Sequence, residues 1–134
     1  MEVLQENEYA KVYFDNELKT GVIVWKDYKL TSEAYRDAFE VLIKFSEGKD
    51  IFHNYFSDGR LQSVVSPDDR KWFQENIIPK AIKNGLKRGA VLISGNSFKK
   101  YYMNMIIKGS RKFPIEIKIF DKEDKALNWI KSFE

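Results

Sequence analysis

The sequence predicts an α/β domain in which a five-stranded, mostly parallel sheet is covered by four helices. Two kinds of segment alternate along the chain. Short apolar or alternating runs have the length of strands, and longer segments have apolar residues at helical spacing. Gly and Pro residues mark the junctions, and no repeat, low-complexity run or linker interrupts the 134 residues. We therefore expect one domain over residues 1–134, in the order β-β-α-β-α-β-α-β-α, with right-handed crossovers between the parallel strands.

Each strand and helix has its own local signal. A hairpin comes first and each later strand follows a helix, so the predicted strands are residues 9–14, 21–25, 51–56, 89–94 and 115–120. The last of these alternates strictly between apolar and polar residues, which predicts an edge or half-exposed position. The predicted helices begin at small polar capping residues, namely Thr31 or Ser32, Ser66, Ser97 and Asp121. Pro79 falls inside the second helix and is expected to kink or split it.

Composition excludes several classes of function. Hydrophobic residues make up 43% and charged residues 32%, which is typical of a globular protein. The absence of cysteine excludes disulfides, thiolate metal sites and a cysteine nucleophile, and the single histidine, His53, leaves no standard zinc site. No apolar run approaches the roughly 20 residues of a membrane span, and the first residues do not resemble a signal peptide. We expect a cytoplasmic protein that needs no metal or cofactor.

Charge is distributed unevenly along the chain. Residues 76–115 contain nine basic side chains and no acidic one, whereas residues 1–75 contain 15 acidic and 10 basic side chains. The basic stretch predicts one positively charged surface for an anionic partner, formed by Lys99, Lys100, Lys108, Arg111 and Lys112. A solvated face without a partner is the alternative. A nucleic-acid partner is disfavoured because the first 75 residues are acidic and the chain has no recognised nucleic-acid motif.

The best candidate site is the turn Ser57-Asp58-Gly59-Arg60, together with Ser66 at the expected start of the second helix. Open α/β sheets bind ligands at the carboxyl ends of their strands, and a polar turn with a glycine suits that position. In this interpretation Asp58 accepts hydrogen bonds from a partner and Arg60 contacts an acidic group. An ordinary Asx-type turn is the alternative, and a pair between Asp58 and Arg60 would fit both.

Residues spread over nearly the whole chain resemble those of one family, namely Trp25, Asp58 with Arg60, Trp72, Ile78-Pro79, Gly85, Arg88-Gly89-Ala90, Phe120, Ala126 and Trp129-Ile130. The resemblance is to the SpoIIAA-like branch of the STAS domains, a group often compared with the CRAL-TRIO lipid-binding fold. In the anti-sigma antagonists of this family, the second serine of an Asp-Ser-Ser-Gly-Leu turn is phosphorylated to switch partners. When the glycines are aligned, Asp58 stands at that serine and Phe56 at the leading aspartate, so the resemblance implies binding without the same serine chemistry.

These observations lead to hypotheses from three classes. The first is a non-catalytic binding or regulatory module of STAS type that meets a protein partner through the turn after the third strand. The second is a carrier of a small anionic, amphipathic or lipid-like ligand held between helices and sheet. The third is a hydrolase that uses Asp58 with Ser57 or His53. A homodimer is also plausible, because Met103 and Ile107 add apolar surface to the third helix and the fifth strand is expected at an edge.

Overall fold

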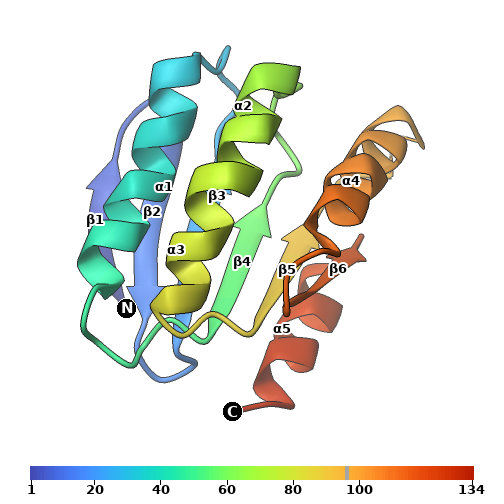
Figure 1. Ribbon diagram of the computed structural model, residues 1–134. Helices are drawn as coiled ribbons and strands as arrows, with labels where there is room; N and C mark the ends of the chain where they lie inside the picture. Colours follow the sequence, from blue (N-terminus) through green and yellow to red (C-terminus); the bar gives the residue numbers. More distant parts are fainter. Residues whose placement is uncertain (96) are drawn as a thin grey trace.

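The computed structural model describes residues 1–95 and 97–134, without the side chains of residues 97–99, 101–103 and 106. Within these residues the chain forms one α/β unit built on a six-stranded mixed sheet (Figure 1). Its strands are β1 Glu2–Glu6, β2 Ala10–Asp15, β3 Thr20–Trp25, β4 Asn54–Asp58, β5 Arg88–Leu92 and β6 Glu116–Phe120.

The strands lie in the sheet in the same order as in the chain. The β1–β2 and β2–β3 pairs are antiparallel, and β3, β4, β5 and β6 run parallel to one another. The expected hairpin, the parallel part of the sheet and the edge position of the last strand are therefore confirmed. The sheet is mixed because its first two pairings are antiparallel.

The expectation of five strands is wrong, because β1 pairs with β2 along the other edge of the sheet. The sequence of β1, Glu-Val-Leu-Gln-Glu, has neither the apolar run nor the alternation that marks a strand. A register shift between Val3 and Gln5 further breaks the period of two. Backbone pairing with β2 defines this half-exposed edge strand, and its own side chains give no strand signal.

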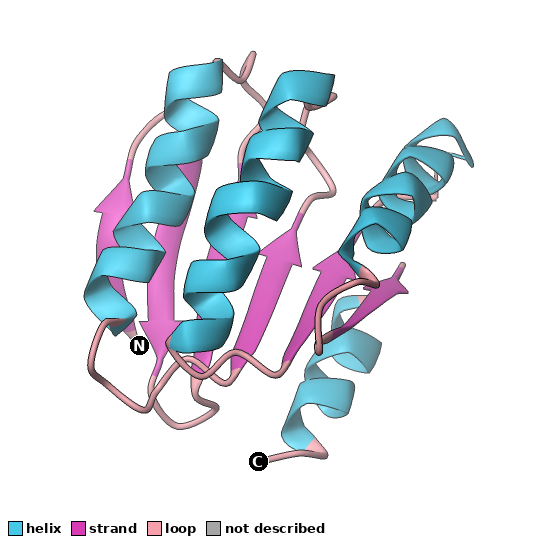
Figure 2. Ribbon diagram, viewed as in Figure 1, coloured by secondary structure: helices cyan, strands magenta, loops and turns pink. Residues whose placement is uncertain are grey.

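Four helical regions accompany the sheet in the described residues. The first is α1 Ser32–Ser46, the third is α4 Ser97–Ser110 and the fourth is α5 Glu123–Lys131. The second consists of α2 Pro67–Trp72, η1 Phe73–Ile77 and α3 Ile78–Lys83, which follow one another without a gap. Because the parallel strands follow one another in chain order, right-handed crossovers place the helices between them on one face of the sheet. Figure 2 shows α1 and the α2–α3 region in front of the strands, with α5 behind them. The structure thus has a well-covered face and a face covered in part by α5.

The capping and stripe predictions hold for α1 and for the start of α2, and the predicted cap Ser97 is among the side chains outside the described set. Thr31 caps α1 by accepting the Ala34 backbone N–H, and the whole predicted apolar stripe is buried, namely Tyr35, Ala38, Phe39, Leu42 and Ile43. The second predicted helix continues past Pro79, but a wide π-helical turn, with Ile78 N–H bonded to Phe73 O, interrupts its α-helical pattern just before that residue. Asp121 does not cap the last helix: Lys122 occupies the N-cap position and makes no side-chain hydrogen bond there.

The third predicted strand is displaced. The apolar residues Ile51 and Phe52 belong to the segment before β4, and Phe52 is only 3% exposed because it packs into the core from there. Strand β4 begins at Asn54 and extends to Asp58, so Ser57 and Asp58 are strand residues. An apolar segment that docks into the core without pairing has the same composition as a strand, which explains the displaced boundary.

Two hydrophobic cores lie on the two faces of the sheet. The larger core joins the sheet to α1 and the α2–α3 region through aromatic residues that include Trp25, Tyr35 and Phe39. The smaller core joins it to α5 through Val22, Phe56, Ala90, Leu92, Ala126 and Ile130. No described helix is both long and apolar enough to cross a lipid bilayer.

Candidate functional site

The predicted turn is divided between the two faces of the sheet. Successive side chains of a strand point to opposite faces. In β4, Phe56 packs in the α5-side core, so Asp58 shares its face, while Tyr55 and Ser57 face the α1-side core. The turn itself starts at Gly59, whose backbone N–H donates to Leu92 O at 2.8 Å. Ser57 and Asp58 therefore cannot act together on one ligand.

Asp58 and Arg60 form a bidentate ion pair. Arg60 Nε lies 2.9 Å from Asp58 Oδ1, and Nη2 lies 2.7 Å from Oδ2. The Arg60 backbone N–H also donates to Oδ1, at 3.3 Å. The hydrogen bonds to the Asp58 carboxylate raise the pKa of the Arg60 guanidinium. Arg60 Nη2 also lies 4.0 Å from Glu123 Oε2 at the start of α5, so the pair bridges the strand end and that helix.

Ser57 belongs to a small polar group inside the larger core. It is 6% exposed, and its hydroxyl accepts the Trp25 indole N–H at 3.1 Å. Burial raises the pKa of Tyr55, and this outweighs the hydrogen bonds with Ser57 and Trp25, which lower it. Trp25 is stacked on Tyr35 with ring centroids 5.6 Å apart and planes inclined by 17°. The polar groups of Ser57, Tyr55 and Trp25 therefore satisfy one another's hydrogen-bonding needs near the ends of β3 and β4.

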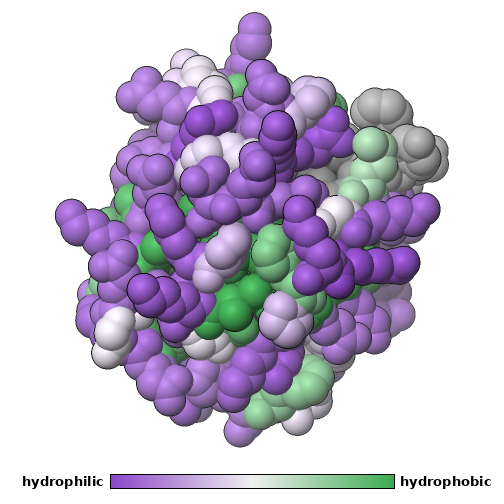
Figure 3. Space-filling view, in the orientation of Figure 1, coloured by the Kyte–Doolittle hydropathy of each residue, from purple (hydrophilic) through white to green (hydrophobic). Residues whose placement is uncertain are grey.

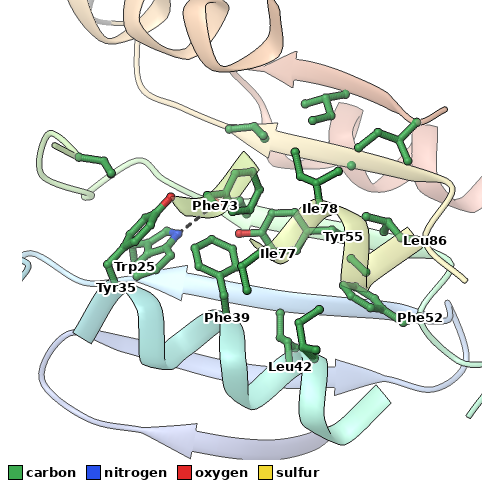
Figure 4. A pocket seen from close by; sticks show the side chains of 18 of the residues that line it. Trp25, Tyr35, Phe39, Leu42, Phe52, Tyr55, Phe73, Ile77, Ile78 and Leu86 are labelled. Atoms are coloured by element: carbon green, nitrogen blue, oxygen red, sulfur yellow. Dashed lines mark hydrogen bonds between the residues drawn. The ribbon is translucent and has the colours of Figure 1, made fainter. Parts of the chain in front are cut away.

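An apolar pocket extends from this polar group between the sheet and the α1-side helices (Figure 4). Its cavity volume is about 70 Å³, which is room for about two water molecules. Figure 4 shows the Tyr55 ring among the lining side chains of α1 and the α2–α3 region. In Figure 3 apolar surface is visible between α3 and α4. The pocket is lined on the sheet side by Gly89 and Val91 of β5, Ile117 of β6, and Ile115 just before β6.

The loop of residues 59–66, between β4 and α2, has an inner and an outer side. Gln62 and Val65 line the apolar pocket. Leu61 and Val64 face solvent with exposed fractions of 59% and 66%. The loop is fixed to the segment before α1, because Ser63 Oγ accepts the Leu30 backbone N–H at 3.3 Å.

The start of α2 is confirmed at Ser66, whose Oγ accepts the Asp69 backbone N–H at 3.2 Å. The acidic residue behind it has a role that the sequence did not indicate. Asp69 is 5% exposed, accepts a hydrogen bond from Ser32 Oγ, and lies 3.0 Å from Arg36 Nε. Burial alone would raise the pKa of Asp69, but hydrogen bonds from Ser32, Arg36 and Ser66 outweigh it and lower the pKa. Asp69 thus ties α1 to α2.

His53 lies at the opposite end of β4 from the candidate turn. Its Nε2 is 2.7 Å from Asp50 Oδ1, and its Nδ1 is 3.7 Å from Glu134 Oε1. Four residues of strand separate it from Ser57, about 13 Å at the usual rise of a strand. The predicted strand 51–56 would put His53 in mid-strand, but the residue precedes β4, and it cannot activate Ser57 or Asp58 from this distance. Among the described residues, no group of three His, Asp or Glu side chains could hold a metal ion.

The predicted basic surface follows α4 and the turn after it. Lys100, Lys108, Arg111 and Lys112 are exposed, while Lys99 and Met103 fall among the side chains outside the described set. Ile107 is half-buried and Met105 is 44% exposed on the same helix. These residues form a surface on a different element from the turn after β4, so the two predicted binding surfaces are distinct.

Comparison with known proteins finds no relative. No family model, curated protein or solved structure matches this chain. The SpoIIAA-like assignment therefore stays a prediction from the sequence. The α/β architecture stands on the structure itself, and function has to be inferred from the chemistry of the loop, the pocket and the opposite face of the sheet.

Proposed function

We propose that this chain is a non-catalytic recognition module, of the regulatory STAS type that its sequence resembles, and that loop 59–66 binds a protein partner. The single observation behind this proposal is the outer side of the loop, where Leu61 and Val64 are exposed next to the ion-paired Arg60. Loops on a rigid sheet are the usual place for binding residues. The partner is expected to offer an apolar groove with a carboxylate near its rim.

The anchoring of the loop supports this proposal. Asp58 holds the Arg60 guanidinium at two points, and the Ser63–Leu30 hydrogen bond ties the loop to the segment before α1. An ordered loop loses less conformational entropy on binding than a mobile one. Tyr28, in the segment fixed by that hydrogen bond, is also 53% exposed. The Arg60 side chain is still 45% exposed and can meet an acidic group.

Site-specific photo-crosslinking tests the proposal. A benzophenone amino acid at position 64 is expected to form a discrete protein adduct in an extract of the source cells. The same amino acid at position 3 is the control, because Val3 is 48% exposed but lies on β1. Leu61→Ser in the same chain should remove the adduct, and as an exposed substitution it should change stability by no more than about 0.5 kcal/mol. An identical adduct pattern at positions 64 and 3 would contradict the proposal.

A second candidate function is the capture of a small amphipathic molecule in the apolar pocket. It is favoured by the Ser57, Tyr55 and Trp25 polar group in a mostly apolar lining. Ordinary ligand pockets occupy about 300 Å³ or more. A cavity of about 70 Å³ admits only a very small molecule unless the helices separate, so this candidate ranks behind the first.

Two substitutions of Gly89 test the pocket. A Cβ at this position would lie 3.7 Å from Tyr55 Cδ2 and 3.8 Å from Ile117 Cγ1, which are ordinary van der Waals contacts. Gly89→Ala should therefore keep the pocket, and the branched side chain of Gly89→Val should fill it. Native mass spectrometry without detergent is expected to find a small molecule on the wild-type chain and on Gly89→Ala, and none on Gly89→Val. A wild-type chain that carries nothing would rule this candidate out.

A further inference from the structure

A groove of about 370 Å³ lies on the face of the sheet opposite α1, between the β2–β3 hairpin and α5. Its volume falls within the range of small-molecule sites. Three side chains of α5 at intervals of four residues form one wall, and the hairpin forms the other. The lining residues are Tyr13, Asp15, Glu17, Leu18, Thr20, Val22, Phe56, Glu123, Leu127 and Lys131.

The floor of the groove is an apolar row across three strands. Tyr13 pairs with Val22, and Val22 pairs with Phe56, so the three side chains lie side by side on one face. Val22 and Phe56 are only 5% and 3% exposed, which makes the floor firm. Leu18 and Leu127 continue this apolar surface on the two walls. A ligand with an apolar body would rest on this floor and remove from water mainly the half-buried side chains of Tyr13, Leu18 and Leu127.

The rim of the groove is acidic. The carboxylates of Asp15, Glu17 and Glu123 line it, with Lys131 as the basic side chain of the lining. Burial raises the pKa of the Tyr13 hydroxyl, and the negative charges of Asp15, Glu123 and Asp58 raise it further. Those charges therefore act on the interior of the groove as well as on its rim. An anionic ligand would be repelled there, and a cation would be attracted.

The hairpin wall is ordered before any ligand arrives. Asp15 Oδ1 accepts the Leu18 backbone N–H at 3.0 Å, and Thr20 Oγ1 donates to Leu18 O at 2.8 Å. These bonds hold the Asp15 carboxylate and the Leu18 side chain at fixed places along the groove. On the opposite wall Glu123 lies 4.0 Å from Arg60 Nη2, a contact that still leaves the Glu123 side chain 54% exposed.

We infer that this groove binds a small organic amine, with its ammonium group between Asp15 and Glu123 and its apolar body on Phe56, Val22 and Leu127. None of the residues of loop 59–66 lines the groove, and the only contact between the two sites that the described residues show is that of Arg60 with Glu123, so ligand shifts centred on Val22, Phe56 and Leu127 are distinguishable from partner binding at Leu61 and Val64. The expected ligand class is an arylalkylamine or a comparable monoamine.

Titration of the full chain with phenethylamine, followed by NMR, tests the inference against a matched neutral probe, 2-phenylethanol. We expect the amine to bind with Kd on the order of 1 mM, as suits a ligand of this size. Its resonance shifts should centre on Val22, Phe56 and Leu127. The alcohol keeps the apolar body and lacks the charge, so it should bind about tenfold more weakly or not at all.

Charge variants complete the test. Glu123→Gln and Asp15→Asn should each weaken amine binding about threefold to tenfold, because each removes one nearby unit charge. The amide oxygen of Asp15→Asn can still accept the Leu18 N–H, so the hairpin is retained. Lys131→Gln should strengthen binding, and Glu33→Gln, an exposed site on α1, should leave it unchanged. Equal binding of amine and alcohol, or an amine affinity unaffected by Glu123→Gln and Asp15→Asn, would overturn the inference.

Discussion

Replacing Trp25 with alanine is expected to lower the free energy of unfolding by about 3 to 5 kcal/mol, the usual cost of removing a large buried aromatic side chain. Trp25 is 2% exposed and contacts both Tyr35 and Phe39 in the larger core. Its loss would leave a cavity next to the apolar pocket and would also remove the donor to Ser57. Urea denaturation followed by circular dichroism measures the change.

Trp25→Phe separates the two contributions. It keeps an aromatic ring in the core but removes the indole N–H, so Ser57 loses that hydrogen bond. A hydroxyl that loses one buried partner costs about 1 to 2 kcal/mol, and the smaller ring adds to this loss. The expected order of stability is wild type, Trp25→Phe, then Trp25→Ala. A loss below about 1 kcal/mol for Trp25→Ala would mean that this end of the core is much less tightly packed than the structure indicates.

The second large effect is expected for Asp69→Asn, with a loss of about 2 kcal/mol at neutral pH. The carboxylate is buried against Ser32 and Arg36, and the amide cannot offer the same two charged acceptors. Arg36 is 38% exposed and can be hydrated after the change, which keeps the cost below that of a fully buried pair. Asp68→Asn is the control, because Asp68 is exposed on the same first turn of α2.

The same substitution predicts a pH dependence. The pKa of Asp69 lies below its ordinary value of 3.8, so the ionised carboxylate stabilises the folded state at pH values above that. The contribution is lost as the pH falls through the lowered folded-state pKa. Wild type and Asp69→Asn should therefore differ most at neutral pH and converge in strong acid. A difference in stability that stays constant from pH 7 down to pH 2 would contradict this role of Asp69.

The parts of the fold that could be predicted are those with a strong local pattern. The α1 stripe, the Ser66-Pro67 start of α2 and the interruption of the α-helical pattern before Pro79 follow from spacing, capping and a missing backbone donor. Strand β1 could not be found in this way, because an exposed edge strand depends on its neighbour for both order and register. Tertiary packing of Phe52 similarly displaced the predicted start of β4.

The residues of the candidate site are arranged in space differently from the single turn that the sequence predicts. The ion pair of Asp58 with Arg60 was anticipated as one of the possible arrangements, and it is present. The sequence predicts Ser57 and Asp58 in a turn, but both belong to β4, where successive side chains point to opposite faces of the sheet. The bond of Asp69 to Arg36 joins residues 33 positions apart, and the groove beside α5 joins the hairpin to the last helix. A pattern of neighbouring residues in the sequence cannot indicate contacts between segments this far apart.

The order of the strands also bears on how the chain folds. Every strand of the sheet after β1 has as a neighbour the strand that immediately precedes it in the sequence. During synthesis each new strand can therefore dock on a surface that has already emerged from the ribosome, without waiting for a distant segment. Short sequence separations between partners lower the entropy lost in closing loops, which favours rapid folding for a protein with a parallel sheet. Assembly from the N-terminus towards α5 is the route that this topology favours.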